Sequence, residues 1–573
     1  MSEYKTSPAD LEGMPPGVPH IIGNEAAERF SFYGMKAVLA VFMAQYLHLM
    51  NDVPGEAMSE ASATANVHLF NGWVYLTPFL GAILSDVFWG KYKTIIWLSL
   101  VYVMGHAALA FMGVTGEARW WLFAGLALIC LGSGGIKPCV SAHVGDQFGA
   151  RNAHLLPKVF NWFYFSINLG AMASMMLTPW LLKWYGPHWA FGVPGVLMAL
   201  ATVVFWVGRK RFIHVPAGGR STLAEMTSPE GVSTILRLLP LYLFVAMFWA
   251  LFDQTGSTWI FQAQDMDREF LGFEWLPSQV QSLNSLFVLT FIPLFAYVLY
   301  PKLSKVWPLT PLRKISVGLF VMAAAFGIVA LVQTRIDGGA SPNIGWQVLA
   351  YAMLTASEVM VSIVALEFAY TQSPKTMKSM VMCFYLGAVA LGNFFTAGIN
   401  HFIEIDEPEK VVESVGTKAA LEEAVARVSA EGRGVKVDDL QDEWGNPLQA
   451  KVLNSRTLRI SSAGEDNKPR TQWDRGVRLV WPEEVKEEKE SWTSALQPDT
   501  PWLEARMDEL GLNTDEEQVE ASDYPFEVEW FVGGGTKLEG AAYFWFFAGL
   551  MLLTAIGFIP YAMKYRGKTV LQD

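Results

Sequence analysis

About twelve long apolar stretches dominate the sequence, and they constrain its fold more than any other feature. A helix needs about 20 apolar residues to cross a bilayer. The chain is 52% hydrophobic and only 17% charged, whereas soluble domains are about 25% charged. We therefore predict an all-α integral membrane protein with spans at 24–50, 66–89, 94–114, 119–144, 159–183, 188–209, 236–263, 275–300, 312–334, 344–370, 378–402 and 541–563.

A basic linker at 209–237 divides these stretches into two sets of six. Lys and Arg gather in alternate short loops, and such loops stay cytoplasmic under the positive-inside rule. We therefore expect a multi-pass protein of the cell (inner) membrane with cytoplasmic termini and no cleavable signal peptide. The expected order is a tail (1–20), a six-helix bundle (21–209), a cytoplasmic linker (210–235), helices 7–11 (236–402), an outer insertion (403–540), and helix 12 with a cytoplasmic tail (541–573).

The insertion differs from the rest of the chain in charge. Residues 402–540 hold 32 acidic and 16 basic residues, a net −16, while the whole chain carries −12. Helical periodicity predicts a helix at 411–432, alternation predicts strands at 457–462 and 477–481, and 483–490 is expected to be a solvated helix face. These patterns predict a small α+β accessory domain.

Residues 438–474 resemble the C-terminal region of type II secretion pseudopilins, in which a WGNP turn, a strand and an SSAGxD-like loop recur. That resemblance implies an alternative with calcium held by Glu465, Asp466 and Asp474. The neighbouring Lys468 and Arg470 argue against a cation there, and the prediction is no metal site.

Charged residues form a stripe in the first apolar helix. Glu25, Arg29 and Tyr33 are spaced by four residues, Lys36 follows, and Glu28 lies beside them. Residues at this spacing share one helix face, and an ionisable group inside a membrane is costly enough to suggest a function. A charged cap at the membrane surface is the alternative, but it would not extend inward to Lys36.

Further polar residues lie inside other apolar helices. His68 and Tyr75 share a face of the second helix, and the imidazole can titrate near neutral pH. Lys137 in the fourth helix is too deep to reach water easily, so its ammonium requires an anion from the protein or a ligand. The remaining candidates are Asp253, Glu358, Asn284, Asn168 and Tyr164.

The two halves of the chain carry complementary charges. Lys36 and Lys137 lie in the first half and Asp253 and Glu358 in the second. A central cavity between two six-helix bundles would satisfy all four. Such a cavity suits a zwitterion, a molecule with separate amine and carboxylate ends, and its titratable groups provide a means of proton coupling.

Several motifs resemble those of the proton-dependent oligopeptide transporter family of the major facilitator superfamily. EAAERFSFYG (25–34) resembles the family's ExxERFxYYG motif, and KVFNWFYFSINLGA (158–171) resembles its FYxxINxG signature. Segments 134–148, 248–257 and 367–379 are similar to further family segments. The resemblance covers about 20–402 and 541–563, and it implies a major facilitator fold with twelve helices.

The resemblance also implies roles for individual residues. Proton coupling is implied for Glu25, Glu28, Arg29, His68 and Asp253, and an outer gate ion pair for Lys36 with Asp253. Trp249 and Tyr75 would line side-chain pockets. Peptide contacts as a whole are implied for Arg29, Tyr33, Lys36, Tyr75, Lys137, Tyr164, Asn168, Trp249, Asn284, Glu358 and Tyr385.

Three positions depart from the family pattern. Lys36 stands where Arg is usual, Phe32 where a tyrosine is common, and Tyr385 where a tryptophan is common. Lys36 keeps the charge but loses the guanidinium fork, and Phe32 lacks a hydroxyl. These departures affect the expected side-chain preference rather than the class of transporter.

We therefore expect a monomeric symporter that imports di- and tripeptides together with protons by alternating access, with peptide-like drugs as further candidate substrates. It would need no cofactor besides protons, bind no nucleic acid and catalyse no reaction. One alternative is a transporter of the same fold for another anion or zwitterion, such as nitrate or an amino-acid derivative. A second is a sensor or assembly protein that acts through the outer domain.

Overall fold

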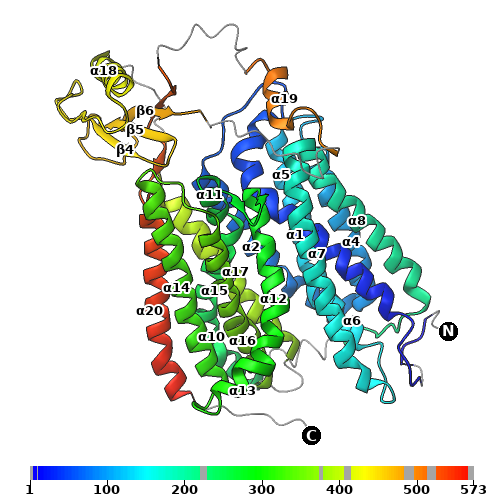
Figure 1. Ribbon diagram of the computed structural model, residues 1–573. Helices are drawn as coiled ribbons and strands as arrows, with labels where there is room; N and C mark the ends of the chain where they lie inside the picture. Colours follow the sequence, from blue (N-terminus) through cyan, green and yellow to red (C-terminus); the bar gives the residue numbers. More distant parts are fainter. Residues whose placement is uncertain are drawn as a thin grey trace.

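The computed structural model describes residues 4–8, 11–219, 229–372, 378–405, 415–482, 496–512 and 524–565. Within these ranges, twelve helical segments are long and apolar enough to cross a membrane, which confirms the predicted number of spans. They form two bundles, and the insertion lies at one end of them (Figure 1). The predicted helix face at 483–490 lies outside the described residues.

The first six spans form the N-terminal bundle. Local signals start its helices: the Ser59 hydroxyl accepts the Ser62 amide at the start of the second span, as an N-cap does. The spans are α1 (Val18–Val41), α2 (Glu60–Leu76) continued by α3 (Pro78–Ile83), α4 (Lys91–Ala110), α5 (Ala118–Ile129) continued by α6 (Gly135–Gly145), α7 (Leu156–Tyr185) and α8 (Pro187–Val207).

The last six spans form the C-terminal bundle. The Thr310 hydroxyl caps the ninth span, and a proline occupies that helix's first turn, where a missing N–H costs nothing. The spans are α10 (Pro229–Phe252) continued by α11 (Thr258–Gln264), α12 (Ser282–Leu294) continued by α13 (Tyr300–Leu303), α14 (Pro311–Asp337), α15 (Gly345–Glu358) continued by α16 (Val364–Thr371), α17 (Lys378–Ile403) and α20 (Ala541–Lys564).

Glycines bring the second and fourth spans unusually close. A Cβ on Gly81 would lie 1.9 Å from the carbonyl oxygen of Gly135, and one on Gly134 would lie 1.8 Å from the Thr77 hydroxyl. A π-helical turn at Cys130–Gly134 separates α5 from α6 at this contact. Such small-residue contacts let membrane helices approach closely, and this one places Lys137 beside α2.

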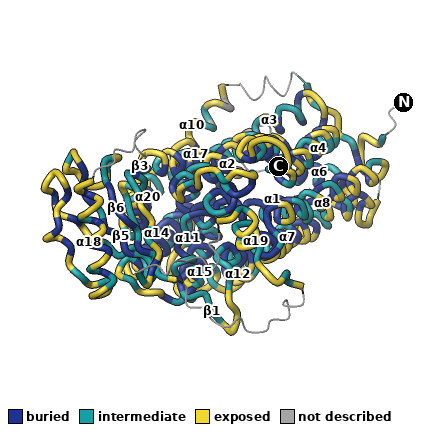
Figure 2. The backbone as a smooth tube through the Cα atoms, turned by 90° about the horizontal axis from the view of Figure 1, so that it is seen from above, coloured by how far each residue is buried: buried dark blue, intermediate teal, exposed yellow. Residues whose placement is uncertain are grey.

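The two bundles meet along their central helices. Viewed from above, buried segments gather where α1, α2, α11 and α17 lie (Figure 2). Gly72 of α2 faces Phe394 of α17, and a Cβ on this glycine would lie 2.5 Å from the ring. The polar residues that the sequence places inside these helices are therefore brought to the interface between bundles.

The insertion contains a helix on a four-stranded antiparallel sheet. Helix α18 (Val415–Glu431) covers β4 (Gln449–Val452), β5 (Thr457–Ser462), β6 (Arg475–Val480) and β7 (Glu527–Val532), which follow this order in the sheet. Leu458 pairs with Leu479 and Ile460 with Val477 across β5 and β6, so alternate residues face the helix. The predicted helix at 411–432 is confirmed over 415–431, and residues 411–414 lie outside the described residues. Both predicted strands are confirmed. This sheet with α18 is called the sheet lobe below.

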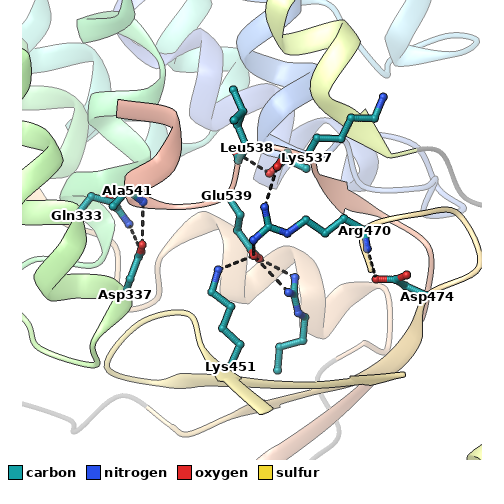
Figure 3. Close-up of polar contacts among 11 residues, drawn as sticks. Gln333, Asp337, Lys451, Arg470, Asp474, Lys537, Leu538, Glu539 and Ala541 are labelled. Atoms are coloured by element: carbon teal, nitrogen blue, oxygen red, sulfur yellow. Dashed lines mark hydrogen bonds and ion pairs between the residues drawn. The ribbon is translucent and has the colours of Figure 1, made fainter. Parts of the chain in front are cut away.

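The sheet lobe is fixed to the C-terminal bundle near the start of α20 (Figure 3). The Glu539 carboxylate accepts hydrogen bonds from Lys451 Nζ and Arg459 Nη1, both at 2.6 Å. Two short strands, β3 (Glu404–Ile405) and β8 (Gly535–Thr536), pair at the base of the insertion. A separate helix, α19 (Trp502–Glu509), lies over the N-terminal bundle instead (Figure 1).

Glu465, Asp466 and Asp474, the calcium ligands of the alternative interpretation, lie in a loop of the sheet lobe. Among the described residues, no group of three or more His, Cys, Asp or Glu side chains converges. Asp466 accepts the Lys468 amide and Asp474 accepts the Arg470 amide. These carboxylates stabilise the turns of their own loop.

Candidate functional site

A chain of buried polar contacts joins the bundles on the side of the insertion. Lys36 Nζ of α1 lies 2.7 Å from Asp253 Oδ1, just after α10. Asn393 of α17 donates from Nδ2 to Asp253 Oδ2, also at 2.7 Å. His68 Nδ1 of α2 lies 2.8 Å from Asn393 Oδ1, and its Nε2 lies 3.2 Å from the Ser257 hydroxyl. Residues from both bundles therefore share one network, called the gate network below.

The gate network fixes one tautomer of His68. Because Asn393 donates from Nδ2 to Asp253, its Oδ1 accepts, and the His68 Nδ1 must carry a hydrogen. In neutral His68, Nε2 accepts from the Ser257 hydroxyl. If Nε2 binds a proton, that hydroxyl can accept instead and turn toward the carbonyl oxygen of Gln254, 3.5 Å away. The network can thus accommodate either charge state of the imidazole.

Other hydrogen bonds close the same side of the interface. The Ser59 and Ser62 hydroxyls at the start of α2 each donate to Glu404 Oε1 at 2.6 Å, at the end of α17. Gln279, just before α12, donates to the carbonyl oxygen of Met176 in α7 at 2.9 Å. The bundles are thus held together at the end that faces the insertion.

The EAAER motif forms a compact buried ion cluster. Arg29 Nε lies 2.7 Å from Glu25 Oε1 and 3.1 Å from Glu28 Oε2. The Ser133 hydroxyl of the fourth span donates to Glu28 Oε1 at 2.9 Å. Two carboxylates share one guanidinium, so uptake of one proton would make this cluster neutral.

Lys137 is held by aromatic rings rather than by an anion. Its Nζ lies 4.0 Å from the centre of the Phe32 ring and 4.2 Å from that of Tyr75. This buried nitrogen has no hydrogen-bond partner within the described part of the chain. The faces of aromatic rings attract cations, so Phe32, which departs from the family pattern, is one of the two rings in contact with the ammonium.

Glu358 provides the acidic counterpart in the C-terminal bundle. Its Oε2 accepts a hydrogen bond from Asn284 Nδ2 at 2.8 Å, and the same amide lies 3.1 Å from the Thr355 hydroxyl. A π-helical turn begins directly after Glu358, and such turns often occur at functional sites. The carboxylate is therefore held in place by α12 and α15.

The remaining predicted peptide-contact residues are placed as follows. Asn168 donates to the carbonyl oxygen of Tyr164, one turn earlier in α7, and that tyrosine is 39% exposed. The Tyr385 hydroxyl donates to the carbonyl oxygen of Ser362 at 2.9 Å. Tyr33 packs edge-to-face on Phe32, and Trp249 packs against Phe248 and Phe252.

Several polar partners were not predicted from the sequence, among them Asn393, Ser257, Ser133 and Thr355. Asn393 is a polar residue within an apolar helix (AVALGNFFTAG), which is the signal that identified His68 and Glu358. Hydroxyl side chains give a weaker signal, because Ser and Thr also bond to the backbone of their own helix.

Two six-helix bundles that meet at a charged interface define a multi-pass membrane protein of the major facilitator fold. The model of the POT family matches residues 92–228 and 220–411. The chain belongs to the POT family.

Among curated proteins, rat solute carrier family 15 member 2 is 37% identical over an alignment of 413 residues, and the match covers 64% of this chain and 55% of the rat protein. Peptide transporter family 1 of Drosophila melanogaster is 35% identical over an alignment of 369 residues, and the match covers 57% of this chain and 48% of that protein. The chain thus spans about half the length of the curated relatives it matches.

Two solved structures are also similar. The POT family transporter PepTSo is 38% identical with a TM-score of 0.62, covering 68% of this chain and 90% of that one. A structure described as an auto-inhibited POT family peptide transporter is 29% identical with a TM-score of 0.66. That match covers 98% of this chain and 99% of the other, so it includes the insertion.

Proposed function

We propose that the chain is a proton-coupled symporter that imports di- and tripeptides by alternating access. Two groups carry this proposal. The Lys137 ammonium of one bundle has no hydrogen-bond partner among the described residues, and the Glu358 carboxylate of the other bundle is held by Asn284. A short peptide has a carboxylate and an ammonium at opposite ends, so it can bridge two such groups. The peptide transporters named among the relatives support the same substrate class.

Proton coupling is supported by the groups that link the bundles. A proton bound to His68 in the gate network, or to the cluster of Glu25, Glu28 and Arg29, changes the net charge of a buried interface. Protons are the proposed coupling ion, and transport needs no other cofactor. The closed side faces the insertion, so peptide and proton would be released on the opposite side.

The proposed topology follows the distribution of basic loops. The protein is proposed to lie in the cell (inner) membrane as a monomer, with cytoplasmic termini and the insertion outside. Peptides, protons and the lipid bilayer are the proposed partners.

Uptake into proteoliposomes tests the proposal. We expect an inward proton gradient to drive accumulation of labelled dialanine, and expect Glu25→Gln to abolish accumulation. Competition by unlabelled tripeptides, but not by nitrate or single amino acids, distinguishes peptide transport from the alternative transporter of the same fold. Accumulation without a gradient, or competition by nitrate alone, would contradict the proposal.

We also propose that the insertion restrains transport. The sheet lobe is fixed to the C-terminal bundle, while α19 docks on the N-terminal bundle. Trp502 stacks on Tyr46 at a ring distance of 5.8 Å, and Arg506 donates to the carbonyl oxygens of Leu49 and Asn51 at 3.0 and 3.1 Å. The insertion thus contacts both halves on the closed side, and the structural neighbour described as auto-inhibited supports restraint.

Variants of α19 test this restraint in the full chain. Trp502→Ala and Arg506→Gln remove docking contacts and are expected to raise the rate of uptake. Ala505→Ser changes the exposed face of the same helix and serves as the matched control. Uptake at the parent rate in both docking variants would show that α19 does not restrain the cycle.

A further inference from the structure

A short hairpin between the seventh and eighth spans carries an exposed apolar tip. Strands β1 (Glu269–Phe270) and β2 (Phe273–Glu274) pair in antiparallel fashion around Leu271 and Gly272. Leu271 is 78% exposed and Phe273 is 62% exposed. Two large apolar side chains adjacent at one tip are unfavourable in water, so their surroundings need an explanation.

The hairpin is rigidly mounted on the C-terminal bundle. Asn343, just before α15, donates to Asp267 Oδ2 at 2.9 Å and to the carbonyl oxygen of Glu269 at 2.8 Å. The Ile344 amide donates to the carbonyl oxygen of Asp267 at 2.7 Å. Phe270 and Trp275 pack onto the core of the bundle. These contacts turn one pair of apolar residues inward and leave the tip pointing away.

The backbone at the tip takes a conformation that is unusual for leucine. Leu271 has a φ of 55°, in the left-handed region that favours Gly, Asn or Asp. A polar residue would suit both this conformation and exposure to water. The leucine therefore combines backbone strain with an exposed apolar surface, and burial in an apolar medium would compensate for both.

The position of the hairpin identifies that medium. The seventh span ends at Gln264 and the eighth begins at Pro277, so the tip lies within a few residues of the membrane boundary. Seen along the bundle axis, β1 lies at the edge of the molecule beyond α12 and α15 (Figure 2). Trp346, at the start of α15, is 45% exposed and follows closely on Asn343 and Ile344, which hold the hairpin in place. Tryptophan is enriched where a membrane meets water.

We infer that the β1–β2 hairpin is an interfacial anchor whose tip, Leu271 and Phe273, inserts into the lipid leaflet on the side of the insertion. Its apolar tip continues the lipid-facing surface of α15 outward, and Glu269 and Glu274 at its base remain in water. The anchor holds the loop that joins the Asp253 and Ser257 segment to α12. The lipid leaflet thereby contacts the part of the C-terminal bundle that carries the gate network.

Spin-label accessibility tests this inference without any peptide. A nitroxide is attached to Leu271→Cys in nanodiscs of phosphatidylcholine, and its collisions with oxygen and with a water-soluble nickel chelate are compared. The matched control is Val415→Cys on the sheet lobe, where the parent residue is 82% exposed. The three native cysteines are buried, and the parent chain reports their background.

We expect the ratio of oxygen to nickel collisions to be severalfold higher at position 271 than at 415. Phe273→Cys provides a second reading should the first variant fold poorly. A ratio at 271 and 273 equal to that at 415 would place the tip in water and overturn the inference. Protection from both reagents would place it against protein, such as a second copy of the chain, and would overturn it equally.

Discussion

Asn393 offers the sharpest test of the gate network, because it is the residue that connects the histidine to the ion pair. Asn393→Leu removes the donor to Asp253 Oδ2 and the acceptor for His68 Nδ1. Leaving a buried polar group unsatisfied costs about 1–3 kcal/mol. When the bundles separate on this side, water reaches both groups, so the penalty applies only to the closed state.

The expected shift follows from that asymmetry. A net penalty of about 2 kcal/mol in the closed state changes the ratio of closed to open forms by about thirtyfold, since 1.36 kcal/mol corresponds to a factor of ten. Pulsed electron resonance between spin labels at Trp120→Cys and Trp346→Cys, one in each bundle, measures this ratio. We expect a longer distance to become populated in Asn393→Leu.

The same substitution at Asn400, about two turns later in α17, provides the control. Asn400 is also buried in α17, but it donates to the Tyr543 hydroxyl of α20 within its own bundle. Asn400→Leu should destabilise the fold without changing the distance distribution. An unchanged distribution in Asn393→Leu, or an equal shift in Asn400→Leu, would refute the reasoning.

Three further predictions follow from single contacts. Lys137→Ala should reduce the preference for a dipeptide over its C-terminal amide by about tenfold or more, because it removes a hydrogen bond between charged groups. Competition in the uptake assay measures this preference, and Lys183→Ala should leave it unchanged. Burial raises the pKa of Asp265 to about 6. The stabilisation that the protonated carboxyl provides is therefore fully present below pH 3.8, the ordinary pKa, and is lost as the pH rises above about 6. Asp265→Asn should therefore raise the melting temperature at pH 8 but not at pH 4. Burial also raises the pKa of Glu539, but the charges of Arg459 and Lys451 outweigh burial and hold that pKa below its ordinary value. The stabilisation that this carboxylate provides is lost as the pH falls through its lowered pKa. Glu539→Gln should therefore abolish this acid-induced loss in thermal unfolding.

The twelve spans and the main elements of the sheet lobe could be predicted because each depends on local patterns. Apolar runs of about 20 residues have few alternatives to crossing a membrane. The strand at 457–462 alternates between buried and half-buried residues in the structure, as its sequence pattern implies. Helix α19 was not predicted, because eight residues, half of them charged, give a weak helical signal. Its position also depends on docking to Tyr46 and Leu49.

The candidate site could be predicted only in part. Its charged members stand out because charge is rare in apolar helices, and the family motif paired Lys36 with Asp253. The links through Asn393 and Ser257 depend on how α2 and α17 align across two bundles, which no local pattern encodes. The rings around Lys137 likewise depend on the glycine contact between the second and fourth spans.

The contacts of Lys137 explain how an ammonium can remain buried without a hydrogen-bond partner among the described residues. A permanent carboxylate partner would satisfy the ammonium but would compete with the carboxylate of a peptide. Rings attract the cation at about 0.5–2 kcal/mol, less than the penalty of leaving a charge with no partner, so they stabilise the ammonium without occupying its hydrogen-bonding capacity. A tyrosine at position 32 would keep the ring and add a hydroxyl. Phe32→Tyr should therefore preserve uptake while Phe32→Leu weakens it, and equal uptake by both variants would show that the ring itself is dispensable.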